Sequence, residues 1–269
     1  MEKNRPIASP EAMISIIRTI GIVPFSKCSV PGWSIQEMTD PDFCFTTSDQ
    51  LGPWDWKVDA VQSGIVYGKF LSRKSAFATE EMYRHLMNWR RSLPYYRMAE
   101  GGRYKATTID DRLHKYLSPV LLSAIRKHET LDSSELRGIL EKEVPLEVRK
   151  KVGGYVGKNL IPKVTKQAVD FIMQFLEMGT WTVVGDITRV YRGPNCEYKG
   201  WQRNSITTPD LLFKVMDQPS EAPFWAKILE DETTRASMPL CSPEESRDHI
   251  IQAVSKFFPD APEALKKMI

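Results

Sequence analysis

The sequence predicts a mostly helical α+β protein. Apolar residues recur at helical spacing in several segments, and two pairs of neighbouring segments have the composition of β-strands. Glycine, proline and helix-capping residues separate these segments. The chain has 269 residues, of which 42% are hydrophobic and 26% charged, which allows one large domain or two to three small ones with their own cores.

Local signals in the first half predict helices around one hairpin. Gly21 ends the first helix, Ser34 and Glu37 form a capping box, and Thr79 caps the helix that follows the hairpin. The expected elements are a helix over residues 11–20, a short helix after Ser34, a short helical or turn segment over 54–61, strands over 64–71 and 74–79 around Ser72-Arg73, and a helix over 80–91. The Gly101-Gly102 pair then marks a loop or domain junction.

The second half predicts three helices followed by a long hairpin. Ser118 caps the first helix with Pro119 in its first turn, Asp132 caps the second, and Gly179 stops the third. The expected elements are helices from Ser118 to about His128, over 133–141 and over 162–177, strands over 181–191 and 201–207, a short segment over 211–215, and helices over 244–257 and 262–268.

Three helices followed by a hairpin is the order of a winged helix, in which the third helix can enter a major groove and the hairpin can contact the adjacent backbone. Because helix, hairpin and helix also recur in the first half, we predict tandem winged-helix units. The expected domains are an N-terminal winged-helix-like unit over residues 1–105, a central winged helix over 106–210, and a C-terminal helical segment over 211–269 that packs on the body.

Aromatic and basic side chains alternate between Trp54 and Arg91. Rings stack on bases and cations neutralise phosphates, so this mixture favours a nucleic-acid surface; the alternative is an aromatic core with a charged rim. The net charge of +3 hides two basic stretches, residues 66–127 with 13 Lys and Arg against 5 Asp and Glu, and residues 142–199 with 10 against 6. In the folded protein we expect the two stretches to form one positive face. The alternative is that their charges are scattered over the surface. The candidate DNA-binding residues are Lys69, Arg73, Lys74, Arg90, Arg91, Lys163, Thr165, Lys166, Arg189, Arg192, Lys199 and Arg203.

No metal or cofactor is expected. The four histidines and four cysteines share no ligand spacing, and residues 153–159 depart from the phosphate-loop pattern. The sequence has no secretory signal and no apolar run of the length that spans a membrane, so we expect a cytoplasmic protein.

Several short motifs carry a family resemblance. They are Trp54-Asp55-Trp56-Lys57, Tyr67-Gly68-Lys69-Phe70, Met87-Asn88-Trp89-Arg90-Arg91, and the 180–211 region with its Ile187-Thr188-Arg189-Val190-Tyr191 strand. In this order they resemble the winged-helix DNA glycosylases of the AlkZ type, which unhook interstrand crosslinks and excise alkylated bases, and more closely the smaller AlkZ-related proteins. The resemblance implies tandem winged helices wrapped around a duplex, with an active site that faces the damaged nucleotide.

The chain lacks the pair of glutamines, separated by one residue, with which these glycosylases hold the catalytic water. Where the pair is expected, the chain has Pro24 and Phe25, which can neither orient nor activate water. We therefore expect a monomer that binds alkylated or distorted double-stranded DNA without this chemistry. One alternative is an active DNA glycosylase in base-excision repair, with Asp55 as the replacement base and Tyr67 or Asn88 orienting the substrate. Another is a winged-helix module for protein interaction or ligand sensing that has no role on DNA.

Overall fold

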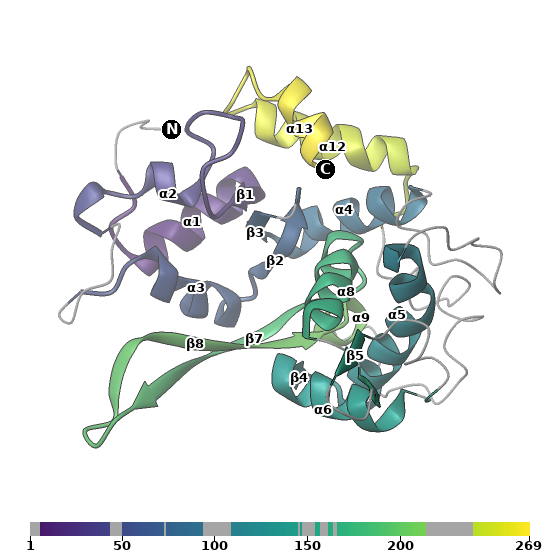
Figure 1. Ribbon diagram of the computed structural model, residues 1–269. Coiled ribbons are helices and arrows are strands. Elements are labelled where there is room, and N and C mark those ends of the chain that lie inside the picture. The colour runs from purple at the N-terminus through teal and green to yellow at the C-terminus, as the bar shows by residue number, and fades with distance from the viewer. Residues whose placement is uncertain are drawn as a thin grey trace.

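The computed structural model describes residues 6–43, 50–72, 74–93, 109–144, 146, 154–156, 161–163, 166–213 and 239–269. Over these residues the chain is a mostly helical α+β protein with one six-stranded antiparallel sheet and a separate pair of short strands (Figure 1). The predicted fold class is therefore confirmed, while the winged-helix arrangement of each half stays a prediction. The Gly101-Gly102 junction lies outside the described residues.

The first half contains the predicted helices and hairpin. Ser9 Oγ caps α1 by accepting from the amide of Ala12, and Gly21 ends this helix with a φ of +89° that favours glycine. Ser34 and Thr79 each cap the helix that begins directly after them, as predicted. The elements are α1 (Pro10–Ile20), β1 (Ile22–Pro24), α2 (Ile35–Met38), the 3-10 turn η1 (Pro41–Phe43), α3 (Pro53–Gln62), β2 (Val66–Leu71), β3 (Lys74–Ala78) and α4 (Glu80–Ser92).

The second half differs from the prediction at two helix starts. The helix predicted to begin at Ser118 already begins at Ile109, and Pro119 lies inside it. Leu117 and Leu121 are both fully buried on either side of the proline, so tertiary packing overrides the local capping signal. The third helix begins at Lys166 rather than near Pro162, because residues 161–163 pair with another strand instead.

The other predicted helices and the long hairpin of the second half follow the predicted order, whereas the short strands over residues 131–132, 154–156 and 161–163 were not predicted. Asp132 caps its helix with a capping box, and the long hairpin is present. The elements are α5 (Ile109–His128), β4 (Leu131–Asp132), α6 (Ser133–Glu143), β5 (Gly154–Val156), β6 (Ile161–Lys163), α8 (Lys166–Met178), β7 (Val183–Arg192), β8 (Glu197–Thr207), α9 (Pro209–Leu212), α12 (Pro243–Ser255) and α13 (Pro262–Met268).

One sheet joins the two hairpins. Its strand order is β1-β3-β2-β7-β8-β4, and Tyr67 of β2 pairs with Val184 of β7 at the junction. Beyond this point β7 and β8 continue as a two-stranded ribbon that projects from the body below α3 (Figure 1). The junction therefore places the N-terminal hairpin beside the base of this ribbon.

The C-terminal helix α12 packs along α4. Ile250 and Val254 of α12 are fully buried, and the Asn88 amide of α4 donates to Cys241 O and Ser246 Oγ at 2.9 Å each. Among the helices that the structure describes, none combines the length and the apolar character needed to cross a membrane.

Candidate functional site

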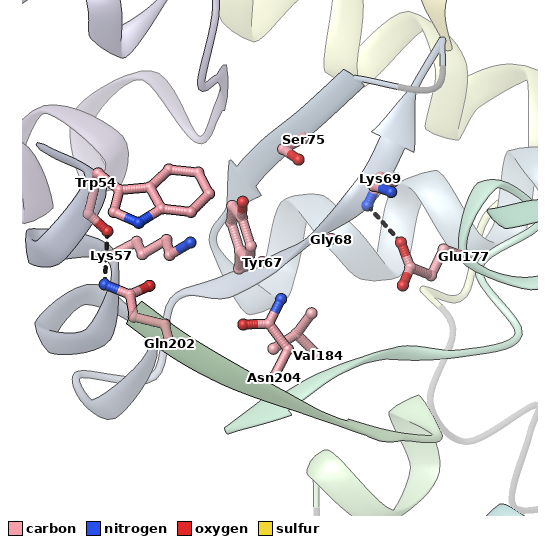
Figure 2. A pocket seen from close by; sticks show the side chains of 10 residues that line it. All are labelled: Trp54, Lys57, Tyr67, Gly68, Lys69, Ser75, Glu177, Val184, Gln202 and Asn204. Atoms are coloured by element: carbon pink, nitrogen blue, oxygen red, sulfur yellow. Dashed lines mark hydrogen bonds between the residues drawn. The ribbon is translucent and has the colours of Figure 1, made fainter. Parts of the chain in front are cut away.

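A pocket of about 310 Å³ lies where the two hairpins meet (Figure 2). Helix α3 and strands β2, β3, β7 and β8 line it, together with the end of α8. Because side chains alternate along a strand, Gln202 and Asn204 of β8 both face the pocket. The lining residues are Trp54, Lys57, Tyr67, Gly68, Lys69, Ser75, Glu177, Val184, Gln202 and Asn204.

Lys57 places a buried amine in this pocket. Its side chain comes from α3 and is only 2% exposed. The Nζ atom lies 3.3 Å from the ring centroid of Trp54 and 5.6 Å from that of Tyr67. Burial lowers the pKa of Lys57 from 10.5 to about 8, although the nearby Asp55 acts in the opposite direction. An amine with such a pKa is available as a base or nucleophile near neutral pH.

Glu177 provides a carboxyl group from the opposite side of Tyr67 (Figure 2). Its Oε2 accepts from the backbone amide of Lys69 at 3.1 Å. Burial raises the pKa of Glu177, and the Lys69 amide and charge offset part of this rise. Burial also raises the pKa of Tyr67, with a hydrogen bond to Ser75 acting against it. A pocket carboxyl with a raised pKa is suited to acid–base chemistry.

Glu177 is not among the residues predicted from the sequence, although its position carries a signal. Val169 and Met173 precede it at intervals of one helical turn, and both are buried. A carboxyl group that continues an apolar stripe at this spacing is a candidate for a buried acid.

Asp55 lies outside the pocket lining, whereas a catalytic base would have to be part of it. It is fully buried and does not line the pocket. Its Oδ2 accepts from the Gly52 amide at the start of α3, and its Oδ1 accepts from the hydroxyl of Tyr198 on β8. Burial and this hydrogen bond raise the pKa of Tyr198 to about 12. Asp55 therefore caps α3 and docks it on the ribbon.

The other two candidate catalytic residues are separated. Tyr67 lines the pocket, whereas Asn88 lies outside its lining and its amide joins α4 to α12. Of the three candidate catalytic residues, all of which the structure describes, only Tyr67 lines the pocket.

Arg90 and Arg91, two candidate DNA-binding residues, lie inside the protein. The Arg90 guanidinium donates to the carbonyl oxygens of Phe70 at 3.1 Å and Met268 at 2.7 Å. Arg91 donates to Thr180 O at 2.6 Å and stacks over the ring of Trp181, 4.2 Å from its centroid. Burial lowers the pKa of Arg91 to about 10. Both guanidinium groups therefore connect elements of the fold rather than face a phosphate.

The ribbon carries most of the remaining described candidates. Arg189 pairs with Asp59 at 2.9 Å and holds α3 against β7. The exposed side chains of Lys199 and Arg203 contact carboxylates at 3.3 and 3.5 Å, which are weak pairs at a surface. Arg192 stacks over Trp201, which is 56% exposed.

The remaining DNA-binding candidates are two lysines of the N-terminal hairpin and four residues that the structure does not fully describe. Lys69 and Lys74 are exposed, and Lys74 Nζ donates to the carbonyl oxygen of Lys27. Arg73 and Thr165 lie outside the described residues, as do the side chains of Lys163 and Lys166.

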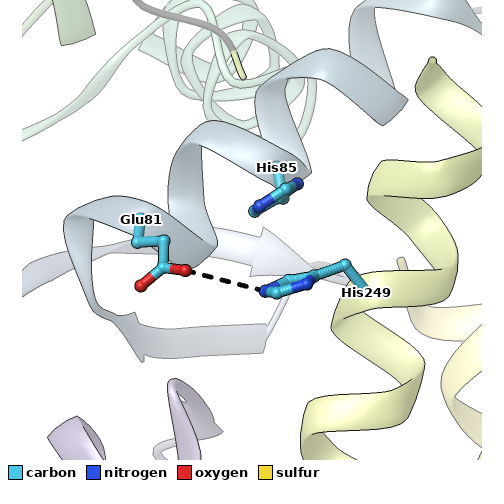
Figure 3. A group of neighbouring side chains, drawn as sticks. All are labelled: Glu81, His85 and His249. Carbon is cyan, nitrogen blue, oxygen red and sulfur yellow. Dashed lines mark ion pairs between the residues drawn. The ribbon is translucent and has the colours of Figure 1, made fainter. Parts of the chain in front are cut away.

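A second group of titratable residues lies between α4 and α12 (Figure 3). His85 and His249 stack with ring centroids 4.1 Å apart, and His249 Nε2 lies 3.8 Å from Glu81 Oε1. Potential ligand atoms of all three residues lie within 4.8 Å of one another, although the sequence spacing indicated no metal site. The rings are nearly parallel, so their in-plane lone pairs do not converge, and one ring would have to turn to hold a metal ion.

Comparison with known proteins identifies a family. A family model described as AlkZ related matches residues 7–269, which is nearly the whole chain. Searches of curated proteins and of solved structures found no match. The resemblance inferred from the short motifs is therefore confirmed, and the chain belongs to the AlkZ-related family.

Proposed function

We propose that this protein binds double-stranded DNA at alkylated or distorted sites and holds a displaced nucleobase in the pocket between its hairpins. The family relationship supports a DNA-repair-glycosylase-like protein. The pocket carries the more specific proposal, because it combines the rings of Trp54 and Tyr67 with polar groups of Lys57, Gln202 and Glu177. Enzymes that examine single bases stack a displaced base on rings and bind its edge with polar groups.

The size and polarity of the pocket suit one base. A volume of about 310 Å³ is at the lower end of the range for small-molecule sites, roughly 300–1,000 Å³. The amide nitrogen of Gln202 donates to Trp54 O and to the Tyr198 hydroxyl, which fixes the side chain. Its Oε1 is buried and accepts no hydrogen bond from the part of the chain that the structure describes, so it is an unsatisfied acceptor that a base could use once side chains of the lining shift.

The projecting ribbon supports contact with the adjacent DNA backbone. Tyr191 and Trp201 are 58% and 56% exposed, and Arg192 and Lys199 lie beside them on the same hairpin. Exposed rings and cations on one element are typical of surfaces that bind nucleic acid. Lys69 adds an exposed cation at the pocket.

Fluorescence anisotropy with labelled duplexes tests this proposal. We expect the protein to bind at about 50 mM salt and to lose affinity steeply by about 200 mM, because phosphate contacts release counterions. It should prefer a duplex with an N7-alkylated guanine or a mismatch to an intact duplex. Trp54→Ala should remove this preference, whereas Trp201→Ala should weaken binding to every duplex equally. The absence of binding at low salt would contradict the proposal and favour a module without a role on DNA.

Glu177 favours a second candidate function, excision of the displaced base. A pocket carboxyl group with a raised pKa could activate water, a role that the sequence analysis assigned to Asp55. An alkylated duplex is incubated with the protein and then treated to cleave abasic sites. If excision occurs, Glu177→Gln should abolish it. Asp55→Asn, which perturbs the docking of α3 instead, should lower both folding stability and activity. An uncleaved duplex with the wild-type protein rules out this second function.

A further inference from the structure

We propose that the amine of Lys57 forms an imine with an aldehyde that enters the pocket, and that the ring-opened sugar of a DNA abasic site is this aldehyde. The inference rests on the proposed function, because DNA supplies the substrate. It adds a covalent step that uses Lys57 Nζ as the nucleophile. The side chain extends from α3 toward Tyr67, with its amine beside the Trp54 ring (Figure 2).

The surroundings of Lys57 differ from those of a phosphate-binding lysine. A cation that attracts phosphate is normally exposed, as Lys69 is, whereas Lys57 is 2% exposed. The contacts found for Nζ within the described residues are with the rings of Trp54 and Tyr67, and no carboxylate pairs with it there. A buried amine whose described contacts are ring faces, with no hydrogen bond to them, keeps its lone pair available once the proton leaves.

The protonation equilibrium of Lys57 also suits a nucleophile. An amine attacks a carbonyl only in its neutral form. With a pKa of about 8, roughly a tenth of the Lys57 side chains are neutral at pH 7, against fewer than about one in a thousand for an ordinary lysine. At equal access, Lys57 should therefore react with an aldehyde well ahead of the surface lysines.

The reaction is balanced without a redox partner. The Nζ lone pair attacks the aldehyde carbon to form a C–N bond, and the carbonyl oxygen takes up a proton to give a carbinolamine. The carbinolamine then loses its hydroxyl group as water, and the remaining nitrogen proton is released to solvent or to a base. The products are one imine and one water.

We expect a substrate to reach the amine past the ring of Trp54, which lines the pocket and contacts the amine. This residue is 47% exposed, so its ring forms part of the pocket opening. An abasic sugar lacks the base that a normal nucleotide would bring into the pocket beside the Lys57 amine. Its aldehyde carbon can therefore approach an amine that a normal nucleotide would cover.

A small aldehyde tests the chemistry without DNA. The protein is incubated at pH 7 with 2-deoxyribose 5-phosphate and cyanoborohydride, and modified lysines are mapped by peptide mass spectrometry. We expect Lys57 to be labelled at least about tenfold faster than Lys69, its exposed neighbour in the pocket lining, because of its larger neutral fraction. Labelling of Lys57 no faster than Lys69, in protein whose circular dichroism shows that it is folded, overturns the inference.

An abasic duplex tests the natural substrate. Borohydride should trap a covalent complex that migrates slowly on a denaturing gel. Lys57→Met should abolish this complex, whereas Lys256→Met, at an exposed lysine after α12 and outside the pocket lining, should retain it. Binding is measured in parallel with a tetrahydrofuran abasic analogue, which cannot form an imine. Binding of the analogue without trapping of the abasic duplex refutes the imine and leaves the proposed function intact. Labelling of Lys57 by the small aldehyde without DNA binding supports the imine chemistry and refutes the DNA substrate.

Discussion

Replacing Lys57 with methionine should stabilise the protein, because methionine fills the same space without a buried charge. The lowering of the pKa from 10.5 to about 8 measures the cost of that charge, about 3 kcal/mol at neutral pH from about 1.4 kcal/mol for each pKa unit. Loss of the cation–π contact with Trp54 opposes this gain by about 1–2 kcal/mol. The free energy of unfolding of Lys57→Met should therefore exceed that of the wild type by about 1–2 kcal/mol at pH 7.

The difference between the two proteins should depend on pH in a defined window. The pKa of Lys57 is lower in the folded protein than in the unfolded chain, so the unfolded chain binds more protons between about pH 8 and 10.5. The contribution of Lys57 to wild-type stability is therefore most unfavourable below about pH 8 and becomes less so as the pH rises through this window. Lys57→Met should lose most of its advantage by pH 10.

Urea unfolding followed by tryptophan fluorescence at pH 7 and pH 10 measures both effects. Lys69→Met is the matched control, because Lys69 is exposed in the same pocket lining and its replacement should change stability little. Comparison of variant and wild type at each pH removes the contribution of other groups that titrate in this range. The reasoning is refuted if Lys57→Met is less stable than the wild type at pH 7, or if its advantage is the same at both pH values.

Two further predictions concern the docking of α3 on the ribbon and the histidine pair between α4 and α12. Tyr198→Phe removes a hydroxyl that donates to the buried side chain of Asp55, so it should lower the free energy of unfolding by about 1–3 kcal/mol. Tyr191→Phe, at an exposed residue of the same hairpin, should leave this free energy unchanged. Urea unfolding measures both variants. Burial and the neighbouring His249 lower the pKa of His85, so the unfolded chain binds its proton more readily, and stability should fall as the pH drops below about 6.5. Thermal unfolding at pH 7.5 and 5.5 should show a smaller loss for His85→Gln, and an equal loss would contradict this role.

Much of the secondary structure could be predicted because short sequence segments determine it. Ser34, Thr79 and Asp132 cap helices through amides three residues away, and these contacts need no distant partner. The start of α5 could not be predicted, because Pro119 normally marks a first turn and only burial of the neighbouring leucines keeps the helix continuous there. The pairing of Tyr67 with Val184 joins segments far apart in sequence, and no local pattern indicates it.

The candidate site could be predicted only in part, for the same reason. The aromatic and basic segment correctly directed attention to the region of Tyr67 and Lys69, which line the pocket. Glu177 reaches the pocket only because the two hairpins share a sheet beside the end of α8. Asp55 was predicted as the replacement base, but the Tyr198 hydroxyl that holds it comes from the other half of the chain. Sequence composition therefore indicated a region, and tertiary contacts determined which of its residues line the pocket.

The buried cations of this protein separate into two kinds, and the difference indicates where function lies. Arg90 and Arg91 each donate to backbone carbonyl oxygens, which compensate for the water that these groups lose on folding. Lys57 is as buried as Arg90, whereas Arg91 is half-buried, but the contacts of Lys57 within the described residues are with ring faces, which compensate less. A charge that lowers stability and contributes no structural hydrogen bond is expected to persist where a ligand or a reaction needs it. On this ground the two arginines belong to the architecture, and Lys57 is the residue for which we propose a role in chemistry.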